Sequence, residues 1–300
     1  MKHLELKTLQ YRILEKSYAD RLKTLHYSES GTYYMPLHIR DFLHFIENRG
    51  ITDINQITDQ DINGWINRLK NRKNRRRTGG ISPAHINKHI SALNNFARYL
   101  TESETGNIPS NTPYLKDKDI KKTNILSIEE IQTLYESCQN TIFDFRDRAM
   151  LSVYYGCGLR KREGINLNTE NILFNKKLLH VTKSKNGRER LVPMSPAVMQ
   201  NISDYINRSR PLLLNQNQEE KALFINRYGN RLKGHSMAAS LKRLLAKAEI
   251  KKTAGLHTLR HSIATHLLQS GMKLEDIGKF LGHQSLDSTQ LYTHLANEQQ

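Results

Sequence analysis

Cysteine is nearly absent from this 300-residue sequence, which contains only Cys138 and Cys157. Neither belongs to a pair of C-x-x-C motifs, so the cysteines do not indicate a structural zinc site. We expect two buried thiols rather than a disulfide, because proteins of reducing compartments keep their cysteines reduced.

Long apolar runs and nucleotide-binding loops are also missing. No stretch has the length of apolar sequence that spans a bilayer, and the charged N-terminus lacks the apolar core of a secretory signal. We therefore expect a cytoplasmic protein without a membrane partner. There is no G-x-x-x-x-G-K-[ST] loop, and Lys161 stands where a dinucleotide fingerprint opened by Gly156 and Gly158 needs its third glycine, so no cofactor is expected.

Acidic residues are scarce relative to basic ones. The chain has 46 Lys and Arg against 29 Asp and Glu, which gives a formal net charge of +17. Such an excess favours a polyanionic partner such as nucleic acid over a neutral one.

Two neighbouring segments in the first hundred residues are candidates for contacts with nucleic acid. A strongly basic segment joins two predicted helices and contains Arg72, Lys73, Arg75, Arg76 and Arg77. We expect it to bind phosphates, with a solvated loop as the simpler alternative. The helix that follows carries His85, Asn87 and Lys88, whose amide and basic groups suit the base edges of a major groove.

Hydrophobic periodicity predicts helices throughout the first hundred residues. Apolar residues recur at helical spacing in four stretches: 4–25, 32–49, 58–69 and 83–100. Thr58 is expected to cap a helix because Asp61 follows three residues later, and Ser82 because proline follows directly.

A segment rich in glycine, proline, asparagine and alternating charges interrupts this pattern. We divide the chain into a helical domain over 1–107, a linker over 108–124 and a second domain over 125–300. Two β-rich runs, 178–181 and 189–194, predict a hairpin in the second domain, which is otherwise mostly helical. The expected fold is therefore mainly α with a small β-sheet.

Four short motifs of the second domain combine basic residues with a tyrosine. In chain order they hold Arg160 and Glu163, Lys183 and Lys185, His257 and Arg260, and His283 and Tyr292. Their order and spacing resemble those of the tyrosine recombinases, the family of phage integrases and Xer recombinases. The helical first domain is similar to the SAM-like core-binding domain of that family, and the second to its mixed α/β catalytic domain.

The resemblance implies a reaction that explains these residue types. Tyr292 would attack a DNA phosphodiester and hold the 3′ phosphate as an ester, which conserves the bond energy without ATP or a metal. Arg160 and Arg260 would hold the phosphate oxygens with permanently charged, forked groups. His257 and His283 would also donate to the phosphate, and His257 is a candidate acceptor of the tyrosine proton.

The leaving 5′ oxygen requires a proton, which a lysine on the hairpin can supply as a general acid. The family spacing before Pro193 favours Lys185, and Lys183 is the alternative. Glu163 is expected to orient Arg160 or a histidine rather than to react.

Three other interpretations compete with this one. A DNA-binding protein without catalysis explains the charge but leaves the series of motifs unexplained. A type IB topoisomerase uses similar chemistry but relaxes supercoils as a monomer. A zinc pair formed by His257 and His261 lacks the glutamate of an H-E-x-x-H motif.

The resemblance also implies partners. The DNA would be a duplex with an inverted-repeat core site, bound by two protomers, and four protomers would exchange strands through a Holliday junction. A protein of this kind can be a monomer in solution, is associated with the nucleoid, and can require accessory or directionality proteins. Its task would be integration, excision or dimer resolution.

Overall fold

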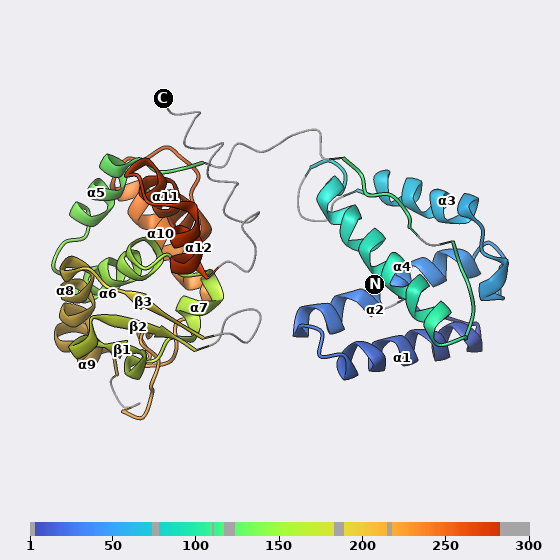
Figure 1. Cartoon of the computed structure of the whole chain (residues 1–300), viewed down its shortest axis with the longest axis horizontal. Coiled ribbons are helices and arrows are strands. Elements are labelled where there is room, and N and C mark those ends of the chain that lie inside the picture. Colours follow the sequence, from blue (N-terminus) through green and yellow to red (C-terminus); the bar gives the residue numbers. More distant parts are fainter. Residues whose placement is uncertain are drawn as a thin grey trace. The chain divides into compact units, whose positions relative to one another are not determined.

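The computed structural model describes residues 4–73, 78–109, 111–116, 124–182, 189–214 and 218–282. Its contacts divide the chain into two compact units, Met1–Lys121 and Lys122–Gln300, whose helices and strands are labelled in Figure 1. Each unit has its own hydrophobic core. The expected fold class is confirmed, because helices dominate both units and the second contains a small sheet. None of the helices in the described ranges combines the length and apolar character needed to cross a membrane.

The first unit packs helices around aromatic side chains. Its main elements are α1 (Leu9–Thr24), α2 (Glu29–Glu47), α3 (Asp59–Lys70) and α4 (Pro83–Glu102), with a 3-10 turn at Ile54–Gln56. The predicted caps are confirmed: Thr58 and Asp61 form a reciprocal capping box, and the Ser82 side chain caps α4. The Phe42 and Trp65 rings, both fully buried, meet edge to face with centroids 5.0 Å apart, so α2 and α3 share one core.

The second unit combines helices with one antiparallel sheet. Its α-helices are α5 (Ile128–Glu136), α6 (Ile142–Leu151), α7 (Lys161–Asn166), α8 (Pro196–Asp204), α9 (Arg210–Leu214), α10 (Gly234–Lys247), α11 (Leu256–Gln269) and α12 (Leu274–Leu281). Shorter turns are π-helical at Ser152–Gly156 and Tyr205–Ser209 and 3-10 at Thr169–Asn171 and Phe174–Lys176.

The sheet has the order β1 (Ile172–Leu173), β2 (Leu178–Val181) and β3 (Arg190–Pro193). The predicted hairpin is confirmed, with Val181 paired to Arg190 where the chain enters and leaves the hairpin loop. Strand β1 was not predicted, because two residues are too few to show a period of two.

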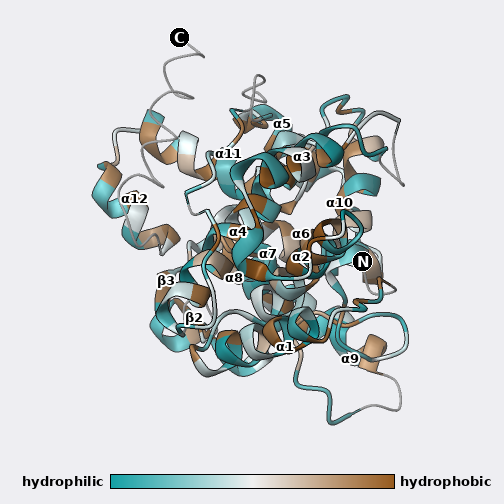
Figure 2. Ribbon diagram, turned by 90° about the vertical axis from the view of Figure 1, so that its right-hand side faces the viewer, coloured by the Kyte–Doolittle hydropathy of each residue, from teal (hydrophilic) through white to brown (hydrophobic). Residues whose placement is uncertain are grey.

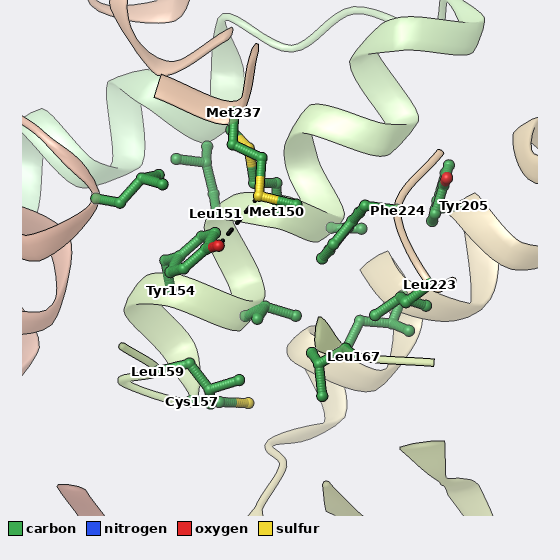
Figure 3. Close-up of a cluster of buried hydrophobic side chains, with 14 of the residues drawn as sticks. Met150, Leu151, Tyr154, Cys157, Leu159, Leu167, Tyr205, Leu223, Phe224 and Met237 are labelled. Carbon is green, nitrogen blue, oxygen red and sulfur yellow. Dashed lines mark hydrogen bonds between the residues drawn. The ribbon is translucent and has the colours of Figure 1, made fainter. Parts of the chain in front are cut away.

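A buried tyrosine in the π-helical turn fixes the start of α7. The hydroxyl of Tyr154 lies 3.1 Å from the Lys161 carbonyl oxygen. It also lies 3.1 Å from Met237 Sδ, as Figure 3 shows. A Cβ added at Gly164 would lie 2.6 Å from the Tyr154 ring, so glycine permits this close approach. The turn thereby holds the segment that carries Arg160 and Glu163.

The last described helix, α12, packs on α11. Hydrophobic and hydrophilic residues alternate along it, as Figure 2 shows. Its buried Ile277 and Leu281 form a small cluster with Ala264 of α11. Gly282 ends the helix with a φ of +67°, in the left-handed region that favours glycine.

The two cysteines are buried and free, as the sequence predicts. Burial raises the pKa of each thiol to about 12. Cys138 and Cys157 are therefore inert packing residues of the second core.

Candidate active site

One buried carboxylate, that of Glu163, lies among three arginines. It accepts hydrogen bonds from Arg160 Nη1 at 2.8 Å and from both terminal nitrogens of Arg190 at 2.9 Å each. Its Oε2 is 4.0 Å from Arg260 Nη1. The structure thus brings Arg160 and Arg260, which are 100 residues apart in the sequence, to the same carboxylate.

The spacing of Arg160 and Glu163 has a local cause. Arg160 is the N-cap residue of α7, and Glu163, three residues later, accepts a hydrogen bond of 2.8 Å from the Arg160 backbone N–H. This is the acidic half of a capping box, which satisfies an N–H that the helix itself leaves unpaired. The same carboxylate therefore starts the helix and holds the arginine side chain.

The C-terminus of α12 anchors both arginines. Arg160 Nη2 donates to the Gly282 carbonyl at 2.7 Å, and Arg260 Nη2 donates to the Leu281 carbonyl at 2.8 Å. Arg260 Nη1 also donates to the Gly158 carbonyl at 2.7 Å. The last carbonyls of a helix lack intrahelical partners and attract cations. Consecutive carbonyls thus place the two guanidinium groups side by side, directly before His283 in the chain.

The cluster is strongly positive. Burial alone would raise the pKa of Glu163, but the hydrogen bonds and charge of Arg190 and the hydrogen bonds of Arg160 outweigh it and lower the pKa to about 2. Glu163 is therefore ionised at neutral pH, and the three arginines exceed it by two charges. Forked cations with excess positive charge suit a phosphate group.

His257 lies in the first turn of α11, beside this cluster. Partial burial lowers the pKa of His257, and the charges of Arg260, Lys161 and Arg160 lower it further. An imidazole with a pKa below 6.5 is mostly neutral at pH 7 and can accept a proton. In the described part of the chain, no group of three or more His, Cys, Asp or Glu is suited to a metal, so the zinc interpretation of His257 and His261 gains no third ligand there.

Several expected site residues lie outside the described residues. They are Lys183, Lys185, His283 and Tyr292, together with Arg75, Arg76 and Arg77 of the basic segment. The roles given to them remain predictions. The described residues nearest to the hairpin lysines are Thr182 and Glu189, which flank the loop.

Arg190 was missed in the sequence. Its position in a β-rich run predicted a strand but not a partner, because Glu163 lies 27 residues earlier in the chain. The one indication in the sequence was the position of this arginine, shortly after the loop that carries the candidate general acids Lys183 and Lys185.

The candidates in the first unit have partners of their own. Arg72 Nη1 donates to the buried Asp41 at 3.2 Å, and Lys73 pairs with Gly80 as an isolated bridge. Asn87 donates to the Leu115 carbonyl at 2.9 Å and accepts from the Leu115 N–H at 2.8 Å. To read a base edge, Asn87 would have to release the 111–116 segment that it holds against α4.

His85 and Lys88 line a hollow on the surface of α2 and α4. Desolvation and the charges of Lys88 and Arg72 lower the pKa of His85. Its imidazole is therefore mostly neutral at pH 7, and Lys88 supplies the positive charge of this surface.

We predict that Gly158→Ala destabilises the protein. Gly158 has a φ of +59°, and a Cβ there would lie 2.7 Å from Leu281 Cδ2 and 3.0 Å from Phe280 Cε1. Left-handed strain and overpacking together should lower the free energy of unfolding by about 2–4 kcal/mol. Urea unfolding measures this loss. In the control Gly255→Ala, the new Cβ meets nothing within 4 Å, so the loss should stay below about 1 kcal/mol. Equal losses in the two variants would contradict the packing described.

Comparisons with known proteins identify the family of the chain. Residues 124–299 match the phage integrase family. The chain is 36% identical over 241 residues to the tyrosine recombinase XerD of Oceanobacillus iheyensis, covering 80% of this chain and 78% of that protein. It is 34% identical over 281 residues to the tyrosine recombinase XerD of Lacticaseibacillus casei, covering 87% and 94%.

Solved structures share the fold. The XerH site-specific recombinase in its post-cleavage complex with palindromic difH substrate gives a TM-score of 0.70 at 20% identity, covering 96% of this chain and 82% of that one. A lambda integrase dimer bound to a COC′ core site gives 0.66 at 16% identity, covering 94% of each chain. Given the family match and the XerD relatives, the chain belongs to the phage integrase family of tyrosine recombinases.

Proposed function

We propose that this protein cleaves and rejoins DNA at specific sites through a covalent bond between Tyr292 and the 3′ phosphate. Strands would be exchanged through a Holliday junction, in integration, excision or dimer resolution. The observation that carries the proposal is the joint anchoring of Arg160 and Arg260 on Glu163 and on the C-terminus of α12. The names of the XerD relatives and the DNA-bound state of the XerH and lambda integrase structures support it.

In the proposed reaction the phenol oxygen of Tyr292 attacks phosphorus, and the bond from phosphorus to the 5′ oxygen breaks. His257 takes the tyrosine proton, which is needed because free tyrosine has a pKa near 10. Lys185, or Lys183, gives a proton to the leaving 5′ oxygen. The reverse attack by a 5′ hydroxyl restores the phosphodiester. The phosphotyrosine ester conserves the energy of the DNA ester bond that it replaces, so the reaction can run in both directions.

The arginines stabilise the charge that develops on the phosphate. Arg160 is the more accessible of the two, with a side chain 28% exposed against 5% for Arg260. Each guanidinium has five N–H donors in a planar fork, and the bonds to Glu163 and to the Gly282 carbonyl use two of those of Arg160. Donors fixed before the substrate arrives stabilise the transition state without reorganisation. His283 would add a further donor to the phosphate.

DNA is also proposed to contact the first unit. Phosphate contacts are assigned to Arg72, Lys73, Arg75, Arg76 and Arg77, and groove contacts to His85 and Lys88, with Asn87 if it exchanges its partner. The net charge of +17 supports this. We also propose that the protein is a monomer in solution, forms a tetramer on an inverted-repeat site, is located at the nucleoid and works with accessory proteins.

The test is a recombination assay on DNA that flanks the gene. Protection and cleavage mapping locates the site, and two copies are then placed on one supercoiled plasmid. We predict Holliday junctions and recombinant circles that require both sites. Relaxed circles without recombinants would instead identify a topoisomerase, and protection without any strand cleavage would identify a binding protein without catalysis.

A further inference from the structure

Arg190 connects three parts of the second unit. It begins strand β3, where it pairs with Val181 of β2 at the base of the hairpin. Its two terminal nitrogens bind the two carboxylate oxygens of Glu163, and its Nε donates to the Phe280 carbonyl at 3.4 Å. The side chain is 12% exposed, so these contacts lie inside the fold.

The contact with Glu163 fixes both the position and the orientation of the carboxylate. A two-pronged arginine–carboxylate pair has one favourable plane, whereas a single hydrogen bond leaves the carboxylate free to turn. The Arg160 side chain is held by one oxygen of this carboxylate and by the Gly282 carbonyl. The direction in which Arg160 points therefore depends on the orientation that Arg190 imposes on Glu163.

Arg190 also packs against the turn that leads to His283. A Cβ added at Gly282 would lie 2.8 Å from Arg190 Cδ and 3.1 Å from its Nε. The side chain thus passes directly beside the turn whose carbonyl holds Arg160. One residue links the hairpin to the C-terminus of α12.

We propose that Arg190 is a positioning residue for DNA cleavage, which fixes the Glu163 carboxylate so that Arg160 meets the scissile phosphate and which ties the hairpin base to the turn at Gly282. The inference rests on the proposed function. Arg190 acts through Glu163 and does not itself touch DNA.

A purely structural role would give a different result. A buried ion pair often adds little net stability, because desolvation offsets the attraction. Arg146 is a matched arginine of the same unit. Its side chain is 8% exposed, and it donates to the Asp147 carboxylate at 3.4 Å and to the Ile225 carbonyl at 3.2 Å. It therefore has a carboxylate and a carbonyl as partners, like Arg190, but lacks the contact with Glu163.

The experiment compares Arg190→Gln and Arg190→Lys with Arg146→Gln. The rate of covalent adduct formation on nicked DNA carrying the mapped site is measured with saturating protein and is expressed per folded molecule, as determined by urea unfolding. We expect both Arg190 variants to lose rate on the order of 10²-fold, as for a misplaced catalytic group, while DNA affinity is retained. Arg190→Lys keeps the charge next to Glu163, and so provides a folded variant if Arg190→Gln unfolds. Arg146→Gln should keep the wild-type rate per folded molecule.

The pH profile gives a second readout. Glu163 is faced by Arg160, Arg190, Arg260, His257 and Tyr154. Without Arg190, the pKa of Glu163 should rise from about 2 towards its ordinary value. The rate of Arg190→Gln relative to wild type should therefore fall as the pH is lowered towards 4.5, whereas the ratio for Arg146→Gln should stay constant. Taking the ratio removes the titration of His257, which both proteins share.

A double-mutant cycle with Glu163→Asp completes the test. If Arg190 acts through the Glu163 carboxylate, Glu163→Asp moves that carboxylate and already removes the effect of Arg190 on the cleavage rate. Adding Arg190→Lys to Glu163→Asp should then slow adduct formation little further. Fully additive losses, or Arg190 variants that match Arg146→Gln in rate, would overturn the proposal. A wild-type protein that forms no adduct on its mapped site would overturn the proposed function instead.

Discussion

Replacing Tyr292 with phenylalanine should abolish covalent attachment of the protein to DNA while leaving DNA binding intact. The change removes only the phenol oxygen, which is the proposed nucleophile, and keeps the ring for packing. A nicked suicide substrate, which loses the fragment bearing the 5′ hydroxyl after cleavage, traps the adduct for a denaturing gel. A gel-shift assay on the same DNA measures binding.

A second tyrosine of the same unit serves as the control. Tyr228 is 62% exposed, so its hydroxyl can be removed without disturbing the core. We expect Tyr228→Phe to form the adduct at the wild-type rate. An undiminished adduct in Tyr292→Phe would show that another residue attacks the DNA.

Replacing either Arg160 or Arg260 with alanine should slow cleavage by about 10²–10³-fold, which is typical for loss of one preorganised donor. The two variants should differ in stability. Arg260 is almost fully buried and holds the Gly158 and Leu281 carbonyls, so its loss leaves two carbonyls without this donor. Arg160→Ala should unfold closer to the wild-type urea concentration. Single-turnover cleavage and urea unfolding separate the two effects.

Arg231 is the control for arginines that only support the fold. It donates to the Ile165 carbonyl at 2.9 Å and to the Leu167 carbonyl at 3.0 Å. Arg231→Ala should therefore lower stability but not the cleavage rate per folded molecule. Wild-type cleavage by both Arg160→Ala and Arg260→Ala would refute the shared phosphate site.

Features that depend on neighbouring residues were predictable from the sequence. The caps at Thr58 and Ser82 follow from residues within three positions, and strands β2 and β3 follow from short β-rich runs. The motif chemistry named Arg160 and Arg260, because phosphate transfer needs permanent, forked cations. The spacing of the motifs did not reveal that two consecutive carbonyls at the end of α12 hold these two arginines.

Features that depend on distant contacts were not predictable. Arg190 meets Glu163 only because the sheet brings β3 to the start of α7. Asn87 reads as a groove residue on a helix surface, yet its amide pairs with Leu115, which lies 28 residues away. Local periodicity contains no information about such pairs, since they form only when each unit folds.

The most direct test of the account is mass spectrometry of the trapped adduct. Wild-type protein is trapped on suicide DNA, and the complex is digested with nuclease and trypsin. No lysine or arginine lies between Lys279 and Gln300, so trypsin leaves Phe280 to Gln300 together on one peptide. We predict that this peptide carries a nucleotide linked through its 3′ phosphate to Tyr292. A nucleotide on any other residue, or one linked through a 5′ phosphate, would contradict the account.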